Sequence, residues 1–397
     1  MRARRLACAL AATAIGVALG GVAVASAQTI SDLTSDLQNL QVRIAAGDKA
    51  AYASQAERIS AVGAAIVAAK PEVWQSKHET DAAVIYLFSG GQPRDIVRLI
   101  ESGAVPPSEI PLLRGALAYV LGNEAEAEKR LSGIDARRLP LRLAGPMAFA
   151  QSVIETSRDS AKAIELLDLA RLLAPGTLVE EAALRREVML EADQHEVERL
   201  ARLARQYASR FGSSVYAEAF LQTLAGALAQ SGAIDNPENF SKFRGFFAAL
   251  APDARRGFLL GLARAAILNG RFEVASMAAT AALDGVPPDT VEEARGKLYE
   301  AMARILTPNY DAALAELQSV AQTRLDRHDQ ELLAAARGVA AFLREPPASS
   351  AEPPPAADVA AMASANPNDA VAQTIVLAEA ALGRTAPLAA VTPKGNL

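Results

Sequence analysis

The stretch SAKAIELLDLARLLAPGTLVEEAALRREVML, residues 160–190, decides the fold. Ala163, Leu167 and Ala170 recur at spacings of four and three, which places them on one face of a helix. Pro175 ends that helix, and a second apolar period opens a few residues later. The stretch therefore predicts two helices joined by a turn. Because the first helix carries small residues where a neighbour must approach closely, we expect further units to stack on it.

Related units occur before and after this stretch. One copy has Gly115 and Ala118 on its first helix and Ala127, Leu131 and Ile134 on its second. A later copy has Val197, Ala201 and Ala204 in the recurring apolar positions. The last copy has Ala313, Leu317 and Val320, which follow a Pro308-Asn309 turn. The clearest copy, residues 258–288, matches the tetratricopeptide pattern at Leu259, Leu262, Ala263, Ala266, Ala275, Ala279, Ala282 and Pro287. The spacing between copies is close to the roughly 34 residues of tetratricopeptide repeats, although the large aromatic residues of that pattern are absent.

Composition agrees with helix-on-helix packing. Hydrophobic residues make up 51% of the chain and aromatic residues only 5%, so the apolar content is mostly alanine and leucine. β-branched and aromatic residues are too sparse for large sheets. We therefore expect an all-α protein, a tetratricopeptide-like right-handed α-solenoid of helical hairpins, followed by a proline-rich linker and a short C-terminal helix.

The remaining segments extend this pattern toward both ends. Residues 31–46 and 52–69 predict a first helical pair. The run Val84 to Phe88 is short and apolar and is compatible with a strand, but Gly90-Gly91 after it and Pro93 beyond favour a helix followed by a second helix. Residues 235–252 hold four of the eleven phenylalanines and predict one divergent helix that packs across the array.

The predicted organisation has four parts. Residues 1–27 form a signal peptide, residues 28–344 the solenoid, residues 345–367 the linker, and residues 368–397 a short helix and disordered tail. The signal has a basic start, an apolar core and an Ala25-Ser26-Ala27 cleavage site, so the expected location is the periplasm. An uncleaved anchor is the alternative for this segment. A lipoprotein signal at Cys8 fits less well, because that cysteine precedes the apolar core.

Removal of the signal takes away three arginines and the only cysteine, which moves the formal charge from −5 to −8. A mature chain without a thiol excludes disulfides and thiolate chemistry. The acidic balance argues against broad nucleic-acid binding. We also expect no membrane span after the signal and no small-molecule substrate.

The search for chemistry finds no catalytic or cofactor motif. The three histidines, His78, His195 and His328, lie far apart and fit no metal-ligand spacing. Phosphate-binding loops, dinucleotide fingerprints and nucleophile elbows are absent from the sequence. Paired glutamates such as Glu180-Glu181 stand at helix starts, where negative charge complements the helix dipole. We therefore expect no enzyme, no metal and no cofactor.

A run of arginines gives the middle of the array a basic face. Its members are Arg185, Arg186, Arg199, Arg202, Arg205 and Arg210. One interpretation is a solvated surface with Glu181-Arg185 and Glu198-Arg202 pairs at spacing four. The other is a binding surface for an acidic or extended partner, formed by Arg185, Arg186, Arg199, Arg202 and Arg205.

Three segments carry a resemblance to a known family. They are DAAVIYLFSGGQP, residues 81–93; LDLARLLAPGTLVEEAALRREV, residues 167–188; and ARQYASRFGSSVYAEAF, residues 204–220. Together with the export signal they resemble the MotC motility proteins of flagellated alphaproteobacteria. The resemblance implies a periplasmic, non-enzymatic protein that is required for flagellar rotation and binds the periplasmic part of the stator protein MotB. The other classes left open are a general envelope scaffold and, more remotely, a peptidoglycan-cleaving enzyme.

Overall fold

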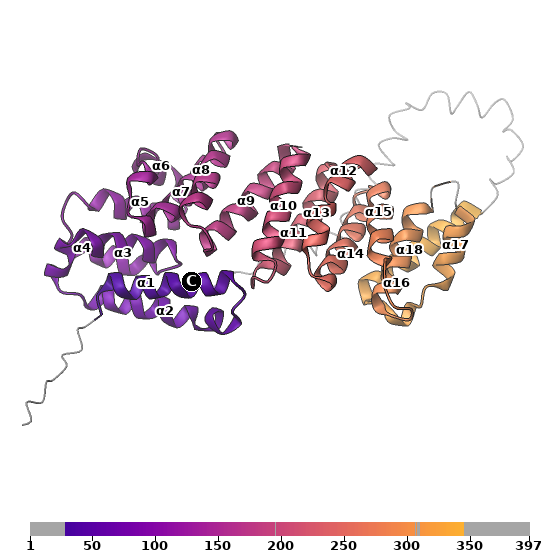
Figure 1. Cartoon of the computed structure of the whole chain (residues 1–397), viewed down its shortest axis with the longest axis horizontal. Coiled ribbons are helices and arrows are strands. Elements are labelled where there is room, and N and C mark those ends of the chain that lie inside the picture. Colours follow the sequence, from indigo (N-terminus) through magenta and orange to yellow (C-terminus); the bar gives the residue numbers. More distant parts are fainter. Residues whose placement is uncertain (1–27, 195, 306, 308–309, 345–397) are drawn as a thin grey trace, which may run out of the picture. The chain divides into compact units, whose positions relative to one another are not determined.

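The computed structural model describes residues 28–194, 196–305, 307 and 310–344. Packing divides the chain into two compact units, the first ending at Leu325 and the second beginning at Asp326. The described part of both units is helical (Figure 1). The predicted signal peptide, linker and C-terminal helix all lie outside the described residues.

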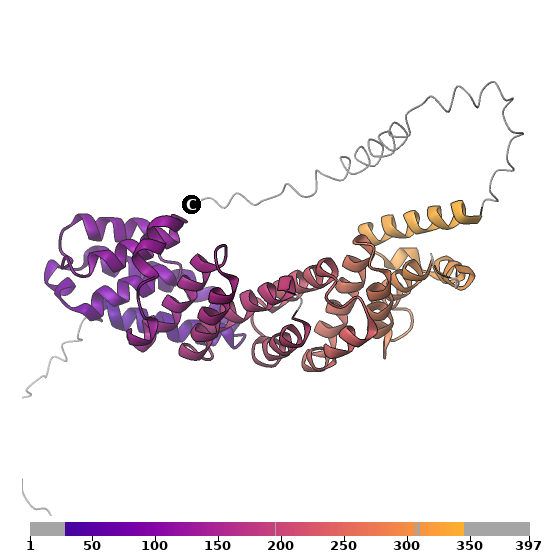
Figure 2. The ribbon, with the colours of Figure 1, turned by 90° about the horizontal axis from the view of Figure 1, so that it is seen from above.

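The first unit is a succession of helices in chain order (Figure 2). Its α-helices are α1 Ile30–Ala45, α2 Lys49–Ala68, α3 Lys77–Phe88, α4 Pro93–Glu101, α5 Ile110–Val120, α6 Glu124–Leu131, α7 Leu141–Glu155, α8 Ser160–Leu173, α9 Leu178–Gln194, α10 Val197–Phe211, α11 Ala217–Ser231, α12 Pro237–Lys242, α13 Arg244–Ala249, α14 Pro252–Leu268, α15 Phe272–Leu283, α16 Val291–Arg304 and α17 Tyr310–Ser319. Three 3₁₀ helices join them: η1 Pro71–Gln75, η2 Ala136–Arg138 and η3 Gln322–Arg324.

Sequential helices pack as hairpins, and alternate helices also contact one another. The pairs α1 and α2, α5 and α6, α7 and α8, and α14 and α15 are antiparallel neighbours, while α1 contacts α3, α9 contacts α11, and α14 contacts α16. Helices that are packed on two sides need small residues at the closest contacts. The all-α class and the hairpin packing are confirmed.

The stretch that decides the fold forms α8 and α9, which pack together. Ala163, Leu167 and Ala170 are fully buried, as their spacing predicts. Helix α8 also packs against α7, a helix that the repeat pattern does not predict. Gly145 makes this second contact possible, because a Cβ at that position would lie 2.5 Å from the Cβ of Ala174.

The run Val84 to Phe88 is helical and closes α3, so the strand interpretation is wrong. Gly90 follows with a φ of 92°, a left-handed conformation that ends helices readily. Pro93 begins α4 as predicted. Every residue from Ala82 to Leu87 is buried, so the second half of α3 is apolar on all sides because helices surround it.

One repeat position is placed wrongly by its spacing. The prediction puts Ile134 on the same helix as Ala127 and Leu131, but α6 ends at Leu131. The buried side chain of Gln151 in α7 explains the early end. Its Nε2 donates hydrogen bonds to the main-chain oxygens of Leu131 and Ile134, each at 2.7 Å, which satisfies carbonyls that a longer helix would have bonded internally.

The phenylalanine-rich segment forms two short helices, α12 and α13, where one was expected. The two meet at Phe243, which ends the first and precedes the second. Phe243 and Phe246 are fully buried, and the ring of Phe246 lies edge-on to Phe258 of α14 at 5.0 Å. The chain bends at Phe243 because both rings must enter the same core.

The clearest repeat copy forms α14 and α15, and the predicted positions within these helices are buried. In the last copy, Ala313 and Leu317 are buried on α17, and Val320 is buried just after it. Pro308 and Asn309 lie outside the described residues. The second unit contains α18, Arg327–Arg344, whose start is capped by a hydrogen bond of 2.9 Å from the Asp329 amide to Asp326 Oδ1.

Candidate functional site

Helix α9 carries four buried glutamates. Glu180, Glu181, Glu187 and Glu191 have exposed fractions of 3%, 0%, 0% and 2%. Glu180, Glu187 and Glu191 lie at spacings of seven and four, which places them on one face of the helix. An ionised carboxylate inside a protein is costly unless a cation and hydrogen bonds accompany it. The residues that pair with these glutamates therefore decide how α9 is held.

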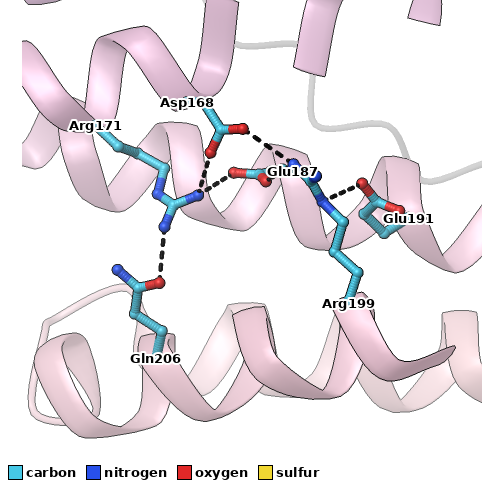
Figure 3. Close-up of polar contacts among 6 residues, drawn as sticks. All are labelled: Asp168, Arg171, Glu187, Glu191, Arg199 and Gln206. Atoms are coloured by element: carbon cyan, nitrogen blue, oxygen red, sulfur yellow. Dashed lines mark hydrogen bonds and ion pairs between the residues drawn. The ribbon is translucent and has the colours of Figure 1, made fainter. Parts of the chain in front are cut away.

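Two arginines from neighbouring helices neutralise Glu187 (Figure 3). Arg171 of α8 donates from Nη1 to Glu187 Oε2 at 2.5 Å, and Arg199 of α10 donates from Nη2 to Oε1 at 2.8 Å. Both arginines also contact Asp168, at 2.9 and 3.0 Å. Burial raises the pKa of the Glu187 carboxyl, while the two guanidiniums act in the opposite direction.

The same arginines extend this network, which we call the α9 ion network. Arg199 Nε lies 2.7 Å from Glu191 Oε1, and Arg171 Nη2 donates to Gln206 Oε1 at 2.7 Å. Figure 3 shows the two guanidiniums on either side of Glu187. The network joins side chains of α8, α9 and α10, so it fixes how these three helices pack.

Glu180 holds the start of α9. Its Oε2 accepts hydrogen bonds from the Gly176 amide at 2.5 Å and from Arg210 Nη2 of α10 at 2.6 Å. Gly176 has a φ of 75°, which suits a residue without a side chain in this turn. The carboxylate thus accepts a main-chain donor at the helix start and also pairs with a cation.

Glu181 lies in a different environment from the other three glutamates. Its Oε1 accepts a hydrogen bond from the Tyr207 hydroxyl at 3.0 Å, and its Oε2 has no hydrogen-bond partner among the described residues. Burial raises the pKa of the Glu181 carboxyl, while Ser214, Arg185 and Tyr207 act in the opposite direction. Burial and the nearby Glu181 carboxylate also raise the pKa of Tyr207. Among the four buried glutamates of α9, Glu181 is the one without an arginine at ion-pair distance in the part of the chain that the structure describes.

The structure divides the predicted arginines into two groups. The first group contacts other helices or loops. Arg185 Cζ lies 5.1 Å from the centroid of the Tyr216 ring, and Arg186 Nη2 donates to Thr156 Oγ1 at 3.0 Å. Arg199 belongs to the α9 ion network. Arg202 and Arg205 of α10 are exposed to solvent. Glu198 forms its direct ion pair with Lys242 of α12, whose Nζ lies 2.7 Å from Glu198 Oε1, and Arg202 acts on the Glu198 carboxylate only at longer range.

Two basic residues of this region escaped the sequence search. Arg171 stands on α8 in the stretch that decides the fold, and its spacing to Glu187 gives no hint of a contact. Arg244 opens α13 and is exposed. Its contribution depends on how α13 packs against α10, which no local pattern records.

The chemistry open to this site is charge pairing. The described residues contain no group of three or more histidine, cysteine, aspartate or glutamate side chains placed to hold a metal ion. His78 and His328 are exposed, and His195 lies outside the described residues. Among the helices of the described ranges, none has both the length and the apolar character needed to cross a bilayer.

Comparison with known proteins relates most of the chain to one family. The Multiphosphoryl transfer protein of Rhodobacter capsulatus is 34% identical over 107 residues, which span 26% of this chain and 13% of that protein. The Chemotaxis protein MotC of Rhizobium meliloti (strain 1021) is 26% identical over 353 residues, which span 87% of this chain and 80% of that protein. No solved structure matches. Residues 1–391 match the family described as Chemotaxis protein MotC, and the chain therefore belongs to this family of chemotaxis and motility proteins.

Proposed function

We propose that this protein is a periplasmic, non-enzymatic accessory of flagellar rotation that binds the periplasmic part of the stator protein MotB. The observation that carries the proposal is the family match over residues 1–391. The expected signal peptide supports the location, and the absence of a catalytic motif from the sequence supports the lack of enzymatic activity.

The hairpins of the first unit support a binding role. In this unit most helices pack against the next one in the chain, and alternate helices also contact one another. Tetratricopeptide-like solenoids are built in the same way. We infer that the hairpins form a right-handed solenoid whose concave side holds an extended segment of the partner. Arg202 and Arg205 are exposed and contact the partner in this proposal, while Arg185, Arg186 and Arg199 hold α9 and α10 in place and add positive potential.

Deletion of the gene tests the role in rotation. We expect cells that assemble flagellar filaments but do not swim, because the proposed protein acts on torque and takes no part in assembly. Complementation with the wild-type gene is the control. Loss of the filaments, or normal swimming, contradicts the proposal.

Binding is tested by a pull-down of residues 28–397 with the purified periplasmic part of MotB. Exchange of both Arg202 and Arg205 for Glu is expected to weaken capture while circular dichroism shows unchanged helicity. Incubation of the same protein with purified cell-wall sacculi tests the enzymatic alternative. Soluble muropeptides released above the level of a buffer control would contradict a non-enzymatic role.

A further inference from the structure

The pair of short helices α12 and α13 interrupts the regular hairpins between α11 and α14. Its core is aromatic. The ring centroids of Phe240 and Phe247 lie 5.3 Å apart, and the ring of Phe246 packs edge-on against that of Phe258 of α14. Helix α13 also packs against α10. This insertion thus contacts both α14 and the basic helix α10.

Gly245 marks the point of contact between α13 and α10. A Cβ at this position would lie 3.0 Å from Cδ of Arg205, so the aliphatic stem of Arg205 lies directly on the glycine. Arg244 is the residue immediately before it and is exposed. Arg202 lies three residues before Arg205 on α10, which places both on one face of that helix. Packing therefore gathers three arginines that are up to 42 residues apart in the sequence.

These three arginines differ from the other basic residues of the region. Arg171, Arg199, Arg210 and Lys242 each form an ion pair with a carboxylate, while Arg185 and Arg186 are half-buried against Tyr216 and Thr156. Arg202, Arg205 and Arg244 form no ion pair within the described ranges, and all three are exposed. Glu198, four residues before Arg202, pairs directly with Lys242, and Lys242 together with the more distant Arg202 lowers the pKa of the Glu198 carboxyl. Three exposed positive charges without a direct ion pair produce a local field that favours an anionic ligand.

We propose that Arg202, Arg205 and Arg244 form one anion-binding patch that receives an acidic, extended protein segment. The proposal rests on the proposed function, since it assigns the chemistry of the segment that the partner presents. The patch supplies guanidinium groups, which pair with carboxylates through two parallel hydrogen bonds. Arg244 is the new member, and α13 brings it to the side of α10.

The surroundings of the patch favour a narrow segment over a membrane surface. Glu198 lies four residues before Arg202 on α10 and Glu238 belongs to α12; their side chains are 65% and 85% exposed, and both lie near Lys242. A bilayer of anionic lipid presents negative charge across a plane and would meet these glutamates together with the arginines. An extended peptide can contact the three arginines and avoid the glutamates.

The test measures binding of residues 28–397 to two probes, a fluorescein-labelled hexaglutamate peptide and the periplasmic part of MotB. Arg244→Glu is expected to raise the Kd for each probe by about tenfold, because the substitution reverses one charge of the patch. The double variant Arg202→Glu, Arg205→Glu is expected to raise both Kd values further. Arg244→Lys keeps the charge and is expected to retain most of the binding. Arg58→Glu is the matched control, because Arg58 is exposed on α2 and forms no ion pair in the described ranges. The Kd of the Arg58→Glu variant for each probe is expected to change less than about twofold.

The outcomes separate the patch from the proposed function. Binding to MotB that Arg244→Glu leaves unchanged overturns the patch and leaves the proposed function standing. Binding to hexaglutamate that depends on all three arginines, without binding to MotB, supports the patch and overturns the proposed partner. Binding to phosphatidylglycerol vesicles that is lost in Arg244→Glu, without binding to hexaglutamate, overturns the acidic segment in favour of a membrane. Equal effects of Arg244→Glu and Arg58→Glu on either probe also overturn the patch.

Discussion

Gln38 of α1 donates a hydrogen bond from Nε2 to the main-chain oxygen of Arg142 in α7, at 2.9 Å and across 104 residues of sequence. The Oε1 of the same side chain accepts a hydrogen bond from Arg142 Nη1 at 3.2 Å. Pro146 lies four residues after Arg142 inside α7 and has no N–H to donate to that oxygen. Gln38 therefore supplies from another helix the donor that the proline removes.

This relationship predicts a coupling between Gln38 and Pro146. Gln38→Met is expected to lower the free energy of unfolding by about 0.5–1 kcal/mol, since a hydrogen bond to a solvent-accessible carbonyl is lost. In the Pro146→Ala background the loss should be smaller, because the main-chain N–H of the new alanine can donate to Arg142 within the helix. Urea unfolding of the wild type, both single variants and the double variant measures the coupling. Equal losses in both backgrounds would show that the two residues act independently.

Gly145→Ala is expected to destabilise the protein by about 1–3 kcal/mol, because the new Cβ would lie 2.5 Å from that of Ala174 and must push α7 from α8. Ala174→Gly in the same chain should restore part of the loss. Gly226→Ala in α11 is the control, since a Cβ there meets nothing within 4 Å. It should stabilise the helix by about 0.5–1 kcal/mol. The melting temperatures of the four proteins check these signs.

Ala275→Leu tests the packed seam of the clearest repeat copy. Ala275 is fully buried on α15, so three added carbons are expected to cost about 1–3 kcal/mol. Ala219→Leu on the exposed face of α11 serves as the control and should leave stability almost unchanged. A melting temperature for Ala275→Leu equal to that of the control would place Ala275 outside the close contacts.

Arg199→Met is expected to lower the free energy of unfolding by about 1–3 kcal/mol. The change leaves Glu191 without its pairing arginine and Glu187 with Arg171 alone, although the partial exposure of Arg199 lets water compensate in part. Arg202→Met, three residues away and unpaired, is the matched control and should change stability little. Denaturant unfolding at two salt concentrations measures both. Equal effects would mean that the ion network contributes no net stability.

Glu181→Gln is expected to stabilise the protein at pH 7.5 and to have little effect near pH 4. Burial raises the pKa of the folded Glu181 above its ordinary value of 4.5, so the folded state favours the proton. This contribution is fully present below pH 4.5 and is lost as the pH rises through the folded pKa, where a buried charge forms. The neutral glutamine removes that cost at high pH.

Urea unfolding of Glu181→Gln at both pH values, beside Glu198→Gln, provides the comparison. The pKa of Glu198 is lowered by Lys242, so its neutral variant should show the opposite sign at pH 7.5. Destabilisation by Glu181→Gln at pH 7.5 would show that the negative charge is needed and that Arg185 compensates it.

Much of the fold follows from local patterns. Ala163, Leu167 and Ala170, and the positions from Leu259 to Ala282 in the clearest copy, recur with the helical period, and each is buried. Helix α7 was missed because Gly145 and Pro146 are residues that normally end helices, and its partners α1 and α8 stabilise it regardless. Ile134 was misplaced because Gln151, from the next helix, takes the carbonyls where α6 ends.

The sequence by itself determined the helical hairpins, because a helix repeats its faces every 3.6 residues and the apolar residues follow that period. Only the tertiary structure decided what each arginine does. Arg199 and Arg202 stand three residues apart on one helix and have the same side chain, yet Arg199 contacts the buried glutamates of α9 and Arg202 is exposed to solvent. The physical reason is that the partner of a charged side chain belongs to the helix that packs beside it. Which helix packs there depends on apolar surfaces that are distant in the sequence.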